Sequence, residues 1–63
     1  MQNRLKEIRV REGISQQLLA ERVGVSRQSI HAIEKGKYVP STELSLKICR
    51  ELEMAVEEVF FLD

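Results

Sequence analysis

The strongest constraint on the fold is a pair of helix signals that stand only two residues apart, at Gly24 and Ser26. Glycine adopts positive φ without the cost of about 1 kcal/mol or more that a Cβ meets there, so Gly24 is predicted to end a helix that Ser15 begins. Ser26 is a favourable N-cap for the next helix. A stop and a start this close force a sharp angle between two helices, with Val25 as an apolar plug under the turn and small Ala20 where they cross.

The second of these helices has two faces of different character. Ile30 and Ile33 recur at helical spacing, and we expect them to hold the helix on the core. The opposite face is free to meet a partner and carries Arg27, Gln28, His31, Ala32 and Lys35.

Helical spacing of apolar residues also appears in residues 2–12, after Pro40-Ser41 and near residues 56–60. No stretch of four or more residues alternates between apolar and polar types, so no strand is predicted. The expected fold is therefore all-α, with five short helices in one domain over residues 1–63. The predicted core positions are Leu5, Ile8, Leu19, Ala20, Val23, Ile30, Ile33, Leu44, Ile48, Leu52, Val56, Val59 and Phe60.

The charged residues are divided unevenly along a chain whose net charge is zero. Residues 1–37 hold eight basic and four acidic side chains, a balance of +4, and residues 38–63 have a balance of −4. Such a dipolar domain can turn a basic face toward phosphates and an acidic face away from them. The alternative is two ordinary solvated surfaces.

Other classes of protein have little support in the sequence. No apolar run approaches the roughly 18 residues that span a bilayer, no apolar signal segment follows Met1, and Cys49 has no partner for a disulfide, so we expect a cytoplasmic protein. His31 has no Cys, Asp or second His at ligand spacing, so no metal or other cofactor is predicted. One His and one Cys assemble no catalytic set, so no enzyme and no small-molecule ligand are predicted.

Residues 16–40 fit the pattern Gln-x-x-Leu-Ala-x-x-x-Gly-Val-Ser-x-x-x-Ile-x-x-Ile-Glu-x-Gly-x-x-x-Pro. In this stretch, and over residues 4–60 more broadly, the chain resembles the Cro/C1-type (XRE family) helix-turn-helix regulators related to lambdoid phage repressors. The resemblance implies a compact five-helix, lambda-repressor-like DNA-binding domain with its helix-turn-helix motif at about residues 15–35.

Within this resemblance, residues 26–35 form a recognition helix that enters the major groove of double-stranded DNA. The positions that it implies for base contact are Arg27, Gln28, His31 and Ala32. The positions that it implies for backbone contact are Gln16, Gln17, Ser26, Ser29, Lys35, Lys37 and Tyr38. Arginine suits guanine O6 and N7, and glutamine suits adenine N6 and N7. The alternatives are that Arg27 is a solvated charge, that His31 is plain surface, and that Ala32 contacts at most a thymine methyl group.

The resemblance also implies a structural ion pair between Arg9 and Glu34, which join the first and third helices. Two positions near the end depart from the family. Glu53 or Met54 stands where a glycine often follows the fourth helix, and Ala55 stands where Ser or Thr usually caps the fifth.

The function implied is that of a sequence-specific transcription regulator, a repressor that binds a palindromic operator as a homodimer. Phe60, Phe61 and Leu62 at the end of the last helix are predicted to form the dimer interface, because consecutive helical residues cannot all point inward. A tail folded back over its own core is the alternative. An antitoxin-like or adaptor module that binds another protein is the alternative function, favoured by apolar Leu18, where the family usually has a polar residue.

Overall fold

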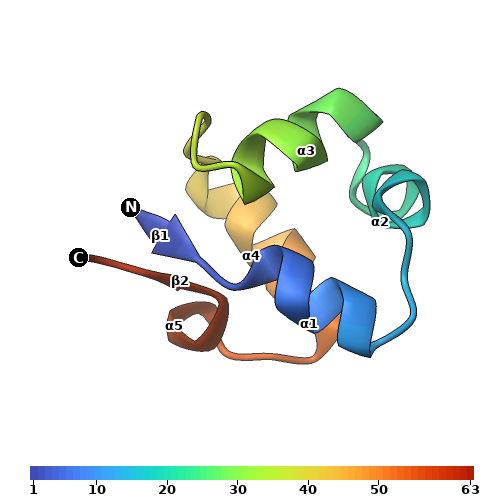
Figure 1. Cartoon of the computed structure of the whole chain (residues 1–63). Coiled ribbons are helices and arrows are strands. Elements are labelled where there is room, and N and C mark those ends of the chain that lie inside the picture. The colour runs from blue at the N-terminus through green and yellow to red at the C-terminus, as the bar shows by residue number, and fades with distance from the viewer.

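The computed structural model describes residues 1–63 and contains five helices, as predicted, and a short two-stranded ribbon (Figure 1). The elements in chain order are β1 (Gln2–Asn3), α1 (Leu5–Arg11), α2 (Gln16–Val23), α3 (Arg27–Glu34), α4 (Thr42–Leu52), α5 (Val56–Val59) and β2 (Phe60–Phe61). The prediction of a compact all-α fold of five short helices is confirmed. None of these helices has the length and apolar character required to cross a membrane.

Serine N-caps set the starts of three helices. The hydroxyl oxygens of Ser15, Ser26 and Ser41 accept hydrogen bonds from the backbone N–H groups of Leu18, Ser29 and Leu44, at 3.0, 3.1 and 3.1 Å. Each bond satisfies one of the N–H groups that a helix start leaves without a partner. At the other end of α2, Gly24 has φ of 80°, the left-handed conformation expected of it.

Every helix contributes to a single apolar core. The side chains that are almost completely buried are Leu5 of α1, Leu19 of α2, Ile30 and Ile33 of α3, Ile48 of α4 and Val59 of α5. Predicted core positions at the edge of this cluster include Val56, which packs against it but is only half-buried. Cys49 is buried beside Ile48 on α4. Because α3 is held by two of the central residues, the position of its outer face is fixed by the core.

The prediction that the chain contains no strand is wrong. β1 and β2 pair antiparallel, with Gln2 opposite Phe61 and Asn3 opposite Phe60, so the two ends of the chain lie side by side (Figure 1). The backbone N–H of Arg4 extends the pairing by donating to the carbonyl of Val59 at 2.9 Å. Two-residue strands are too short to show alternation in the sequence. Their pairing also depends on two segments from opposite ends of the chain.

The ribbon changes what the last residues do. Phe60 lies in a strand with its side chain in the core, and it is 5% exposed. Phe60 is predicted both in the core and at the dimer interface. Because its side chain is buried, Phe60 belongs to the core, and its prediction as an interface residue is corrected. Phe61 is half-buried beneath the guanidinium of Arg4, whose Cζ lies 5.1 Å from the ring centroid, whereas Leu62 is 83% exposed. The predicted helix through these residues therefore ends at Val59.

The two departures near the end are accommodated locally. Glu53 itself takes the left-handed conformation, with φ of 55°, that closes α4 in place of the usual glycine. Ala55 at the start of α5 has no side-chain oxygen, but its own N–H donates to the carboxylate of Glu58 at 2.9 Å. One of the two bonds of a capping box is thus present.

Candidate nucleic-acid interface

α3 lies at the top of the molecule in Figure 1 and presents exposed polar residues on the side away from the core. Its inner face is fixed by Ile30 and Ile33, which are 0% and 1% exposed. The predicted base-contacting residues lie on the other side of the helix. Arg27, Gln28 and His31 are exposed, whereas Ala32 is half-buried. A small half-buried side chain at position 32 leaves room for a close approach to α3.

The start of α2 lies beside this face. Gln16 from α2 and Arg27, Gln28 and His31 from α3 line a hollow of about 200 Å³. The fold thus brings together four residues that the sequence assigned to DNA contact, from two helices separated by a sharp turn. Arg27 and Gln28 have no hydrogen bond or ion pair to another side chain. Their polar groups are therefore free for a partner.

The basic side chains of α3 and of the turn after it also lack acidic partners. Four of the ten basic side chains in the sequence form ion pairs within 4.0 Å, namely Arg9, Arg11, Arg22 and Lys47. Arg27, Lys35 and Lys37 form none, and all three are exposed. α5, which carries Glu57 and Glu58, lies at the lower left of Figure 1, away from α3 at the top. Uncompensated positive charge is therefore available at α3.

The predicted backbone-contacting residues at the helix starts provide free donors. Gln16 and Gln17 are the first two residues of α2, so their backbone N–H groups have no acceptor within the helix. The hydroxyl groups of Ser26 and Ser29 share one hydrogen bond at 3.0 Å, which leaves the proton of one hydroxyl for another acceptor. Helix starts of this kind attract anions through their free N–H groups and their positive dipole end.

The remaining predicted backbone contacts lie where α3 ends. The N–H of Lys37 donates to the carbonyl of Ala32 at 3.0 Å, which holds the turn against the helix. Tyr38 is 46% exposed, and Val39, which was not predicted as a site residue, is 60% exposed. Pro40 is buried and closes the segment. Lys35, Lys37 and Tyr38 are thus held together at one end of α3.

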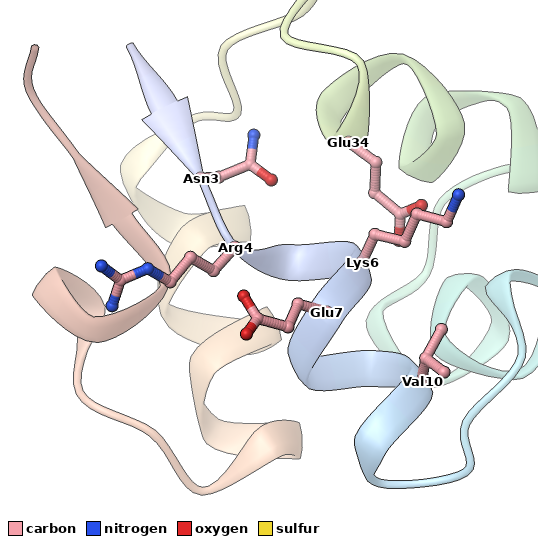
Figure 2. Close-up of a pocket in the computed structure, with 6 residues that line it drawn as sticks. All are labelled: Asn3, Arg4, Lys6, Glu7, Val10 and Glu34. Carbon is pink, nitrogen blue, oxygen red and sulfur yellow. The ribbon is translucent and has the colours of Figure 1, made fainter.

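A buried network of charged side chains joins α3 to α1. The predicted ion pair between Arg9 and Glu34 is confirmed, with Nε and Oε2 2.7 Å apart and side chains that are only 10% and 3% exposed. The remaining amino groups of Arg9 donate to the carbonyl of Ile14 at 2.8 Å and to Oε1 of Glu34 at 3.3 Å. Figure 2 shows Glu34 reaching from α3 toward α1, beside a hollow of about 500 Å³ lined by none of the predicted site residues.

The sequence did not predict how Gln16 joins this network. Its Nε2 donates to Oε1 of Glu34 at 2.9 Å and lies 3.3 Å from Nδ1 of His31. Both hydrogens of the Gln16 amide are used inside the protein, so the atoms left for a phosphate at this position are those of the backbone N–H. A possible signal was the placement of His31 and Glu34 three residues apart, on one face of α3.

The thiol of Cys49, which lies outside this surface, has a shifted pKa. Burial raises the pKa of the Cys49 thiol, and the negative charge of Glu57 raises it further. No three His, Cys, Asp or Glu side chains are grouped so that they could hold a metal ion.

Comparison with known proteins identifies the family of this chain. The family model described as helix-turn-helix matches residues 5–59, which includes all five helices. The chain belongs to the XRE-type helix-turn-helix family. Among helix-turn-helix relatives, it is 56% identical over 63 residues to the transcriptional regulator YgzD of Bacillus subtilis, covering 100% of this chain and 96% of YgzD. It is 44% identical over 63 residues to the regulator MJ0272 of Methanocaldococcus jannaschii, again covering 100% of this chain and 96% of that protein.

Solved helix-turn-helix structures share the arrangement as well. The restriction-modification controller protein C.AhdI of Aeromonas hydrophila superimposes with a TM-score of 0.83 at 33% identity, over 90% of this chain and 86% of C.AhdI. The clp gene regulator ClgR of Corynebacterium glutamicum superimposes with a TM-score of 0.81 at 30% identity, over 86% of this chain and 57% of ClgR. The chain is thus a helix-turn-helix transcriptional regulator, and its fold implies DNA binding. DNA-binding transcription regulators are not a class of enzyme.

Proposed function

We propose that residues 1–63 act as one DNA-binding domain that represses transcription in the cytoplasm by binding a palindromic operator as a homodimer. The observation that carries the proposal is the outer face of α3, where Arg27 and Gln28 are exposed and have no partner within the protein. Inserted into the major groove, an arginine offers a two-bonded contact to guanine and a glutamine offers one to adenine. His31 and Ala32 follow one turn further along the same helix.

The backbone of the same DNA meets a ring of donors around α3. The base-reading face is surrounded by these donors, which are the N–H groups of Gln16 and Gln17, the hydroxyls of Ser26 and Ser29, and the side chains of Lys35, Lys37 and Tyr38. Contacts of this kind fix register and orientation, while base contacts carry the sequence information. The proposal therefore assigns different effects to mutations in the two groups.

Selection of bound sites from random DNA tests the proposal directly, because it gives the half-site and the spacing together. Arg27→Ala is expected to relax the preference at one base pair of each half-site and to cost about 1–3 kcal/mol in binding free energy. The matched control, Lys37→Ala, is expected to weaken binding to all sequences alike. An even loss on every DNA for Arg27→Ala would show that Arg27 does not read bases, and the absence of any preferred site would refute sequence-specific binding.

The homodimer is supported by the apolar side chains left at the chain ends. Leu62 is 83% exposed, Met1 on the other chain end is 46% exposed, and Phe61 is covered only in part by Arg4. A two-fold interface buries such a patch against its own copy. Recognition helices about 34 Å apart, one DNA turn, suit two molecules whose longest dimension is 28 Å.

Changing Phe61 and Leu62 to Ser tests the dimer, because both side chains lie outside the core. We expect a folded monomer that binds half-sites weakly and loses cooperative binding to the full operator. Sedimentation of the wild type and the variant at equal concentration is the measurement. A variant that remains a dimer would refute this interface, and a wild type that stays monomeric at high concentration would refute the homodimer.

A further inference from the structure

The Arg9–Glu34 ion pair fixes the hydrogen-bonding polarity of the groups next to it. A guanidinium offers only donors and an ionised carboxylate only acceptors. Arg9 occupies Oε2 of Glu34 at 2.7 Å and approaches Oε1 at 3.3 Å, and the Glu34 side chain is 3% exposed. Any further polar group that contacts Glu34 must therefore be a donor.

Gln16 is that further group, and the contact settles the orientation of its amide. The atom of Gln16 that lies 2.9 Å from Oε1 of Glu34 must be the nitrogen, since an amide oxygen at that distance would be repelled by the carboxylate. The second hydrogen of the same nitrogen then faces Nδ1 of His31, 3.3 Å away. Gln16 therefore offers His31 a donor and no acceptor.

A neutral imidazole carries one proton on one of its two nitrogens, and the hydrogen bond at one nitrogen determines which. With a donor facing Nδ1, that nitrogen must accept, so the proton resides on Nε2. Nε2 belongs to an exposed side chain that lines the hollow shared with Arg27 and Gln28. His31 thus presents an N–H group on the outer face of α3.

We propose that Gln16 holds neutral His31 as an Nε2–H donor, and that His31 thereby determines specificity for a hydrogen-bond acceptor on the base edge it meets. The acceptors available in the major groove are guanine N7 and O6, adenine N7 and thymine O4, whereas the amino groups of cytosine and adenine are donors. The base-edge part of this inference rests on the proposed function. The tautomer part is a property of the free protein.

The tautomer is measured without DNA, by ¹⁵N–¹H correlation spectra of the His31 ring at about pH 8.5, about two units above the ordinary imidazole pKa of about 6.5. The wild type is expected to show an unprotonated Nδ1 and a protonated Nε2. In Gln16→Leu the fraction of the Nδ1–H tautomer should rise. The matched control is Gln2→Leu, which makes the same change at an exposed glutamine of β1 and should leave the ring spectrum unchanged.

Base preference is measured on the selected site by systematic base-pair replacement and by 7-deazapurines, which lack the N7 acceptor. His31→Ala should reduce discrimination at one base pair by about three- to tenfold, the range that one hydrogen bond supports. Gln16→Leu should reduce discrimination at the same base pair, and Gln2→Leu should not. Thermal unfolding of each variant checks that the fold is retained.

The outcomes separate the two proposals. Equal tautomer populations in the wild type and Gln16→Leu overturn the inference, whatever the protein does with DNA. A second outcome is that the spectra are as expected and binding is specific, but His31→Ala and Gln16→Leu leave every base preference unchanged. That outcome overturns the base-edge part. The expected spectra without specific binding to any DNA refute the proposed function and, with it, the role of His31 in reading bases.

Discussion

Removing one partner of the Arg9–Glu34 pair is expected to destabilise the protein far more than removing one partner of an exposed pair. The two side chains are 10% and 3% exposed, so solvent screens their interaction weakly. Arg9→Met leaves the Glu34 carboxylate buried with only Gln16 as a donor, and it leaves the carbonyl of Ile14 without the Arg9 amino group. Stranding a buried charge in this way costs about 3–5 kcal/mol.

That cost is comparable with the whole stability of a domain of this size. A chain of 63 residues has a free energy of unfolding of about 3–9 kcal/mol. Each kcal/mol lost lowers Tm by roughly 4–8 °C in a small domain. Arg9→Met and Glu34→Met are thus each expected to leave the protein barely folded at room temperature.

A double-mutant cycle followed by urea unfolding and far-UV circular dichroism measures the interaction. The double variant should cost less than the sum of the single variants, because it removes both charges and leaves neither one buried without a partner. The control is the Arg22–Glu51 pair, whose nearest atoms are 3.8 Å apart and whose side chains are 47% and 28% exposed. That cycle should give an interaction of about 0–1 kcal/mol. Equally small and additive effects in both cycles would refute the reasoning.

Four further predictions concern other parts of the molecule. Glu53→Gly should raise the free energy of unfolding by about 0.5–1 kcal/mol, because glycine adopts the left-handed conformation without strain; a loss of stability in urea titrations would contradict this. The raised pKa of Cys49 means that the folded state keeps the thiol proton to higher pH than the unfolded state, so stability should fall as pH rises above about 8.5. Iodoacetamide should also modify Cys49 more slowly in the native protein than in urea, and equal rates would argue against its burial. On the proposed DNA role, the logarithm of the affinity should fall linearly with the logarithm of salt concentration, by about 0.9 per phosphate contact, and a flat dependence would count against it.

The helix-turn-helix could be predicted because its boundaries depend on single residues. A serine that caps a helix and a glycine that ends one act within a few residues, so Ser15, Gly24 and Ser26 indicated their roles without knowledge of the rest of the chain. The core positions followed from helical spacing. The Arg9–Glu34 pair was implied by resemblance, not by spacing, since nothing local joins residues so far apart.

What the sequence did not reveal depends on contacts between distant segments. The β1–β2 pairing joins the two ends of the chain, and two-residue strands have no recognisable period. For the same reason, Phe60 was assigned to a helix instead of a strand. The contacts of Gln16 with Glu34 and His31 also depend on how α2 crosses α3, which residue types alone do not specify. Where the site departs from prediction, the cause is therefore the tertiary arrangement.

The pairing of the two chain ends also bears on how the protein folds while it is being synthesised. β1 is synthesised before its partner β2, which follows only after α1 to α5 have been made. Chains grow at about 5–20 residues per second, so β1 remains unpaired for roughly 3–12 s. During that time the core that buries Leu5 in the finished protein lacks two of its members, Val59 and Phe60. The core that positions α3 is therefore complete only after the segment that contains Val59 and Phe60 has been made.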